Sequence, residues 1–128
     1  MQKPSPTAGL RHVALFSKNL ETCKAFYTDL LGLSIVWQPD DDNIYLSSGS
    51  DNVALHRAPV DFNPIGSQHL DHIGFFLNDK GDVDHWHLYL KEAGVPIKYP
   101  PKDHRDGSRS FYFTDPDDRL VQFIYIKL

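Results

Sequence analysis

Two stretches of the sequence resemble each other and define the organisation of the chain: LRHVALF at residues 10–16 and LDHIGFF at residues 70–76. Each is a short apolar run with a histidine in its third position, His12 in the first and His72 in the second. Short runs rich in branched and aromatic residues, bounded by polar segments, predict β-strands. The same strand pattern occurring twice predicts an internal repeat.

A helix is expected after each of these strands, because apolar residues recur there at helical spacing. The first helix is predicted to begin at Asn19 and to end at Gly32. The second is predicted to begin at Asp82 and to end at Gly94. Asn and Asp are favoured at the first position of a helix, and Gly is favoured just past its end.

Both halves then continue in the same way, with two β-rich runs joined by a tight polar turn. The turn reads SGSDN at residues 48–52 and DPDDR at residues 115–119, which is typical of a hairpin. The order β-α-β-β-β is therefore predicted twice, over about residues 9–58 and 69–127, with a linker at 59–68. We expect an α+β protein in which the two modules pack into one domain spanning residues 1–128, because neither half has enough core alone.

Composition excludes several classes of partner. The net charge is −4 and the isoelectric point is about 5.9, whereas a nucleic-acid binder would carry a basic face. No apolar run approaches the roughly 20 residues that a membrane-spanning helix requires. The single cysteine, Cys23, cannot form an internal disulfide, which fits a reducing compartment, and we expect a cytoplasmic protein.

Four motifs carry a resemblance to a known family: RHVAL, DHIGF, FYTDLLGL and FTDPDDRLVQF. Together with the doubled β-α-β-β-β unit, they make nearly the whole chain similar to the vicinal oxygen chelate superfamily. That superfamily contains glyoxalase I, extradiol dioxygenases, fosfomycin-resistance proteins and bleomycin-binding proteins. The resemblance implies a half-barrel-like sheet around a cavity with helices on the outer face, a divalent metal in the cavity, and a homodimer.

Alternation along the strands assigns side chains to faces. In the first strand Val13 and Leu15 suit the helix side, which leaves His12 on the cavity side. The same reasoning places three further polar side chains on the cavity side: His56, His72 and Gln122.

The resemblance implies metal ligands on the first, fourth, fifth and eighth strands, commonly His, Glu, His and Glu. His12 and His72 match, but Gln122 and Ala54 stand where carboxylates are expected. A set of His12, His72 and Gln122 leaves the charge of a divalent ion uncompensated, so binding of Zn²⁺, Mn²⁺, Ni²⁺ or Fe²⁺ is expected to be weak. This set also differs from the two-His, one-carboxylate arrangement that suits iron and oxygen chemistry.

Other residues are assigned to substrate binding and proton transfer. Arg105 and Arg109, in the polar loop at residues 100–110, are predicted to clamp an anionic group of a substrate. Tyr45 and Tyr112, in equivalent strands, are predicted to donate hydrogen bonds to it. His56 and His104 are predicted to move protons, because the pKa of histidine lies near neutrality.

Three functions remain open from the sequence. The favoured one is an enzyme, an isomerase, lyase or dioxygenase, in which the metal acts as a Lewis acid on a small oxygenated substrate. The first alternative is a non-catalytic binding protein that sequesters a small ligand or antibiotic without a functional metal. The second is a retained fold whose activity is altered or lost. The sequence leaves open whether the site lies within one chain or is shared across a dimer.

Overall fold

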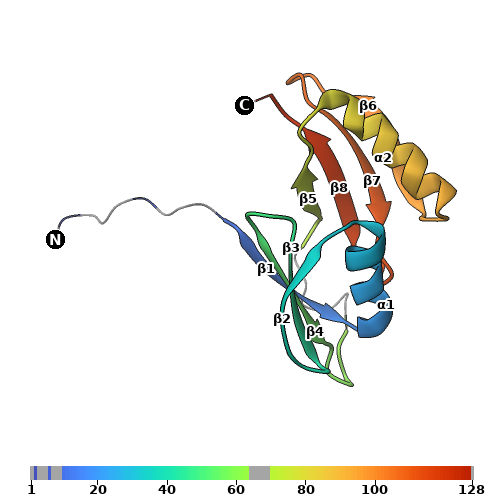
Figure 1. The fold of residues 1–128 in the computed structure, drawn as a ribbon. Coiled ribbons are helices and arrows are strands. Elements are labelled where there is room, and N and C mark those ends of the chain that lie inside the picture. Colours follow the sequence, from blue (N-terminus) through green and yellow to red (C-terminus); the bar gives the residue numbers. More distant parts are fainter. Residues whose placement is uncertain (1, 3–5, 7–9, 64–69, 128) are drawn as a thin grey trace. The chain divides into compact units, whose positions relative to one another are not determined.

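A computed structural model describes residues 2, 6, 10–63 and 70–127. The chain divides into two compact units, Met1–Val60 and Asp61–Leu128, each with one four-stranded mixed sheet (Figure 1). The β-α-β-β-β order occurs in both units, so the predicted α+β class is confirmed. Half of the predicted linker, residues 64–68, lies outside the described residues. The packing of the two modules into one domain stays a prediction.

The sheet of the first unit has the strand order β1-β4-β3-β2, with α1 against one of its faces (Figure 1). β1 runs parallel to β4, and the other neighbours are antiparallel. Its elements are β1 (His12–Ser17), α1 (Leu20–Ala25), a short π-helix (Phe26–Leu30), β2 (Ser34–Asp40), β3 (Asn43–Ser47) and β4 (Asn52–Arg57).

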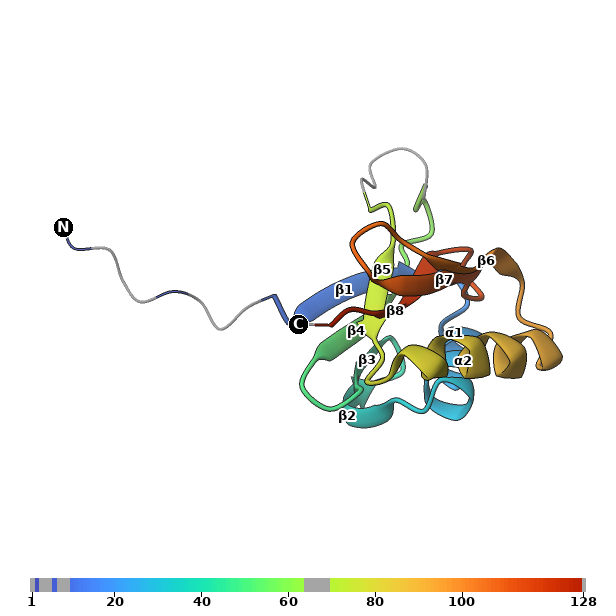
Figure 2. The same ribbon diagram turned by 90° about the horizontal axis from the view of Figure 1, so that it is seen from above.

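The second unit repeats this topology with the strand order β5-β8-β7-β6. β5 runs parallel to β8, and α2 crosses one face of the sheet (Figure 2). Its elements are β5 (Ile73–Phe76), α2 (Lys80–Glu92), β6 (Ile97–Asp103), β7 (Arg109–Thr114) and β8 (Leu120–Tyr125).

The duplication extends to the register of the strands. Ala54 in β4 lies opposite Tyr45 in β3. In the same way, Gln122 in β8 lies opposite Tyr112 in β7. On the other side Gln122 lies opposite Gly74 in β5. Gln122 is therefore the counterpart of Ala54, and Tyr112 is the counterpart of Tyr45.

The helix boundaries agree only partly with the sequence prediction. Gly32 and Gly94 follow the two helical segments with φ of 81° and 82°, as expected of left-handed caps. The predicted start at Asp82 is wrong, because α2 begins at Lys80 and its N-cap is Asp79, whose carboxylate accepts a hydrogen bond from the Gly81 amide. Asp82 lies instead in the first turn.

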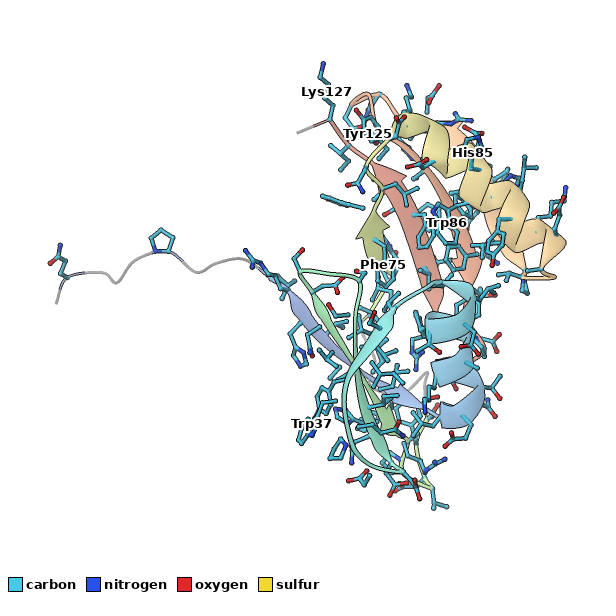
Figure 3. All side chains as sticks on the ribbon, in the orientation of Figure 1. Trp37, Phe75, His85, Trp86, Tyr125 and Lys127 are labelled. Carbon is cyan, nitrogen blue, oxygen red and sulfur yellow. The ribbon has the colours of Figure 1, made fainter. Side chains whose placement is uncertain are left out.

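The core of each unit lies between the helix and one face of its sheet. In β1 the side chain of Leu15 is buried, whereas His12 and Phe16 on the other face are exposed, so the predicted division of this strand is confirmed. Figure 3 shows Trp86 directed from α2 toward its sheet, and Trp37 on the side of its sheet away from α1. We call this other side of each sheet the helix-free face. Among the described residues, no helix is long and apolar enough to cross a membrane.

Candidate functional site

His12 lies on the helix-free face of the first unit, where its neighbour on β4 fixes its ring. The Nδ1 atom of His12 is 2.7 Å from Oδ1 of Asn52, its register partner. Because a carboxamide oxygen only accepts hydrogen bonds, Nδ1 carries the proton and the lone pair resides on Nε2. Nε2 is therefore the atom of His12 that is prepared to bind a metal.

His72 is held in the same way in the second unit, immediately before β5. Its Nδ1 atom is 2.6 Å from Oδ2 of Asp71. The carboxylate accepts the Nδ1 proton, so the lone pair again resides on Nε2. The ring of His72 also contacts the ring of Tyr112 edge-on, with centroids 5.4 Å apart.

Gln122 lies in the middle of the helix-free face of the second unit, on β8. It is 9% exposed and lies between Gly74 and Tyr112, its two register partners. A Cβ atom at Gly74 would come within 3.4 Å of Oε1 of Gln122, so the absence of a side chain there leaves room for the carboxamide. Among the described residues the Gln122 side chain has no hydrogen-bond partner, and it is available to a ligand.

Tyr112 is suited to donate a hydrogen bond from its hydroxyl group. Burial raises its pKa above the ordinary value of 10.0, and the negative charge of Asp71 and the neighbouring Tyr99 act in the same direction. A phenol with a raised pKa stays protonated at neutral pH. Tyr112 therefore offers an O–H group to a substrate oxygen.

A pocket of about 600 Å³ opens on this face. It contains four of the residues predicted from the sequence, namely His104, Arg105, Tyr112 and Gln122. The remaining lining residues are Lys102, Asp103, Asp106, Ser108 and Ile124. A volume in this range is typical of small-molecule sites.

The loop that edges the pocket is shorter than expected from the sequence. Residues 100–110 were predicted as one loop, but β6 extends to Asp103 and β7 starts at Arg109, so the connection is a tight turn at 104–108. Gly107 in this turn has a φ of 88°, which favours glycine. Nε2 of His104 lies 2.7 Å from Oγ of Ser110. The hairpin therefore holds the His104 ring at the pocket wall.

The charges around the pocket favour an anionic ligand. Asp106 accepts hydrogen bonds from the amide and hydroxyl of Ser108, which lower its pKa. Asp103 is paired with Arg109 and Lys80. By contrast, neither Lys102 nor Arg105 takes part in an ion pair within the described part of the chain. The two cations of the pocket are thus available while its two carboxylates are engaged.

Arg109 is not brought together with this group. It lies on the same side of β7 as Phe111 and Phe113, facing α2, and therefore on the opposite side from Tyr112. Its guanidinium forms a bidentate pair with Asp84 of α2, at 2.8 and 3.0 Å, and a third contact of 3.1 Å with Asp103. This arrangement ties the helix to the sheet.

We expect Arg109→Met to destabilise the fold at neutral pH by about 0.5–1 kcal/mol, a small value because the paired carboxylates are half-exposed. Arg109 lowers the pKa of Asp84 and Asp103 below 3.8. A carboxyl group whose pKa is lower in the folded than in the unfolded protein stabilises the fold at pH values above the unfolded pKa. This stabilisation is lost as the pH falls through the folded pKa. Urea unfolding should therefore show a difference at pH 7 that shrinks below pH 3.8. A difference that is independent of pH would contradict the ion-pair role.

The remaining predicted residues, Tyr45 and His56, lie together in the first unit. Nδ1 of His56 is 2.6 Å from Oδ1 of Asn43, which again leaves the lone pair on Nε2. The Tyr45 ring lies between His56, at a centroid distance of 5.8 Å, and Trp37, on which it stacks at 5.1 Å. The helix-free face of the first unit therefore combines a proton-carrying ring with an aromatic surface.

Several polar neighbours of these residues were not found from the sequence. They are Asn43, Asn52, Asp71 and Ser110. Asp71 was detectable, because it directly precedes His72 in LDHIGFF. Ser110 and the asparagines depend on strand register, which the sequence does not supply.

Taken one at a time, each within its own unit, the predicted metal ligands present donor atoms that suit a divalent ion. His12 and His72 each present Nε2, and Gln122 presents a carboxamide oxygen that lacks a partner in the described part of the chain. Imidazole nitrogen suits Zn²⁺, Ni²⁺ and related ions, and carboxamide oxygen is a neutral ligand. No group of three or more His, Cys, Asp or Glu side chains within residues 10–63 and 70–127 is arranged to hold a metal. Gln122, in place of a carboxylate, is consistent with that finding.

Comparisons with known proteins agree with this architecture. The family model described as Glyoxalase/Bleomycin resistance protein/Dioxygenase superfamily matches residues 9–123. The metallothiol transferase FosB of Staphylococcus epidermidis is 32% identical over 115 residues, which cover 88% of this chain and 78% of the relative. The fosfomycin resistance protein FosX of Listeria monocytogenes is 26% identical, with 90% of this chain and 87% of the relative covered. The crystal structure of lactoylglutathione lyase from Agrobacterium tumefaciens superposes with a TM-score of 0.78 at 26% identity, covering 94% of this chain and 96% of that one.

Proposed function

The chain belongs to the glyoxalase/bleomycin resistance protein/dioxygenase superfamily, as its sequence motifs predicted, and we propose that it is a divalent-metal-dependent enzyme acting on a small anionic substrate. The observation that carries the assignment of an anionic substrate is the pocket of the second unit, which contains Gln122 of the predicted metal ligands. In it Gln122 and Tyr112 lie beside Arg105 and Lys102, two cations without ion-pair partners in the described part of the chain. A pocket lined by hydroxyl, carboxamide and cationic groups suits a ligand that bears both neutral oxygens and a negative charge.

His12, His72 and Gln122 are the residues that would hold the metal. When bound, a divalent ion supplies Lewis-acid polarisation of substrate oxygens. Asn52 and Asp71 support this assignment, because each fixes one imidazole with Nε2 unprotonated. Iron sites that activate oxygen use two histidines and one carboxylate, and Gln122 supplies no carboxylate. The set therefore favours Zn²⁺, Mn²⁺ or Ni²⁺ over Fe²⁺, and a dioxygenase is the least supported reaction.

The remaining residues orient the substrate and move protons. Arg105 and Lys102 bind the anionic group, and the Tyr112 hydroxyl donates a hydrogen bond to a substrate oxygen. His104, held by Ser110 at the pocket wall, exchanges a proton with the substrate through its imidazole ring. His56, with Tyr45 beside it, is the corresponding proton carrier in the first unit.

The relatives support a finer assignment to thiol transfer. A metallothiol transferase at 32% identity and a fosfomycin resistance protein at 26% each cover about nine tenths of this chain. We propose addition of a low-molecular-weight thiol to a small oxygenated anion: a C–S bond forms, a C–O bond of the substrate breaks, and the released oxygen takes up the proton that the thiol gives up. A homodimer and a cytoplasmic location stay predictions.

The test is an assay with purified protein, fosfomycin as the anionic probe, and glutathione or cysteine as the thiol. Zn²⁺, Mn²⁺, Ni²⁺ and Fe²⁺ are added separately, and the covalent adduct is measured by mass spectrometry. The proposal expects adduct with at least one metal, none after chelation, and none with His72→Ala. No adduct under any metal and thiol combination would contradict thiol transfer.

We expect Arg105→Ala to raise the KM for the anionic substrate by about 10-fold while kcat stays close to the wild-type value. A hydrogen bond to a charged group contributes about 1.5–3 kcal/mol to binding, and at an exposed position we expect the lower end of this range. Loss of binding shared by ground and transition states raises KM alone. Lys98→Ala, an exposed cation on the adjoining strand β6 outside the pocket, serves as the control and should behave as wild type. An unchanged KM in Arg105→Ala would remove Arg105 from the binding role.

A second candidate function, non-catalytic binding of a small ligand, is favoured by the aromatic surface of the first unit. Trp37 is 59% exposed and stacks on Tyr45, and Phe16 on the same helix-free face is 48% exposed. Aromatic surfaces of this kind hold flat or apolar ligands without chemistry. The two functions differ in their need for metal. A ligand that raises the melting temperature equally with and without chelator would favour the binder.

A further inference from the structure

Asp71 makes the shortest contact to either histidine of the predicted metal set. Its Oδ2 atom lies 2.6 Å from Nδ1 of His72. The acceptor is a carboxylate, and hydrogen bonds to an ionised group are roughly twice as strong as those between neutral groups. The corresponding partner of His12 is the neutral carboxamide of Asn52, at 2.7 Å. Each imidazole is thus held at Nδ1 within its own unit, and the two supporting groups differ in charge.

A carboxylate in this position acts on a metal through the ring. It accepts the Nδ1 proton, which fixes the tautomer and the ring orientation, and it raises the basicity of Nε2. Loss of such an outer partner typically costs about 10–100-fold in metal affinity. Asn52 supplies orientation but no negative charge. Asp71 supplies both.

The charge matters because the predicted inner ligands carry none. His12, His72 and Gln122 are all neutral when they donate to a metal, so no carboxylate of that set balances a divalent ion. The Asp71 side chain is 88% exposed, so its charge stays hydrated and the cost of burying a carboxylate is avoided. It therefore provides negative charge one imidazole ring away from the metal.

We propose that Asp71 is a positioning residue for the metal: its carboxylate orients His72 and supplies the negative charge that Gln122, in place of a carboxylate, does not. The proposal rests on the proposed function, because it requires that His72 binds a divalent ion. It predicts that metal affinity is largely retained when the carboxylate is removed from residue 71, next to a ligand, and introduced at residue 122, as a ligand itself.

The test measures Co²⁺ binding to the full-length protein, by calorimetry and by the visible absorption of the bound ion. We expect Asp71→Asn to weaken binding by about 10-fold, the lower end for an outer partner, because the carboxamide still accepts the Nδ1 proton. The absorption spectrum should change as well, since the donor strength of one ligand is altered. Introducing Gln122→Glu into the Asp71→Asn protein should restore most of the affinity.

Asp41→Asn is the matched control, with the same chemical change at an exposed aspartate of the β2–β3 turn, and it should bind as wild type does. Equal affinity of wild type and Asp71→Asn would overturn the positioning role while leaving the proposed function intact. Failure of Gln122→Glu to restore affinity would overturn the charge argument. No binding of Co²⁺ or Zn²⁺ by the wild-type protein would instead contradict the proposed function, and the inference with it.

Discussion

His72→Ala is expected to weaken divalent-metal binding by more than about 100-fold, because the substitution removes a direct metal ligand. Losing a residue that only supports a ligand through a hydrogen bond costs at most about 100-fold. Its Nε2 atom is the one left unprotonated by the contact between Nδ1 and Asp71. Gln122, on the same face, retains only a neutral oxygen and cannot replace it. The measurement is titration of the metal-free protein with Zn²⁺ in competition with a chromophoric chelator.

The control for this change is His85→Ala. The His85 side chain is 81% exposed on α2, the helix that packs on the face of the sheet opposite to Gln122 (Figure 3). We expect the His85 variant to bind Zn²⁺ as wild type does. Equal affinities of the wild-type and His72→Ala proteins would mean that the metal, if it binds, is held elsewhere.

Phe123→Ala is expected to lower the free energy of unfolding by about 3–5 kcal/mol, the range for removing a buried aromatic side chain. Phe123 is 4% exposed and lies at the centre of the aromatic cluster between α2 and its sheet. Its ring contacts four others, with centroids between 5.0 and 5.9 Å away: Phe75, Trp86, Phe111 and Phe113. A loss of this size is a large part of the about 5–15 kcal/mol by which proteins are normally stable.

The matched control is Phe76→Ala, on the helix-free face of the adjacent strand β5. The Phe76 ring is 62% exposed, so its removal should leave the urea midpoint close to that of the wild type. Urea unfolding monitored by tryptophan fluorescence compares the two variants directly. Similar losses in both would contradict the assignment of the core to the helix side of this sheet.

The fold was largely predictable because the chain is duplicated. The strands containing His12 and His72, the hairpins and the two glycine caps each occur twice, so each half supported the interpretation of the other. Alternation also predicted that Leu15 is buried and His12 is not. The start of α2 was wrong because Asp79 and Asp82 both suit an N-cap, and only the backbone at Asp79 is extended.

The candidate site was less predictable, because it depends on register and on strand ends. Arg109 was assigned to the substrate on the assumption that β7 starts after it. Once Arg109 is inside β7, its spacing of two from Phe111 places it on the helix side, with Asp84 as its partner. The contacts of His12 with Asn52 and of His56 with Asn43 arise from strand pairing alone. Asp71 is different, since its position next to His72 was visible in the sequence.

The most direct test of the central claim is the number of imidazole ligands on the bound metal. X-ray absorption spectroscopy of the Zn²⁺-loaded protein counts them, and the same measurement on His12→Ala identifies one of them. We predict two imidazole nitrogens per Zn²⁺ in the wild-type protein and one in the variant. A single imidazole in the wild-type protein, or two in both proteins, would contradict a site that contains His12 and His72.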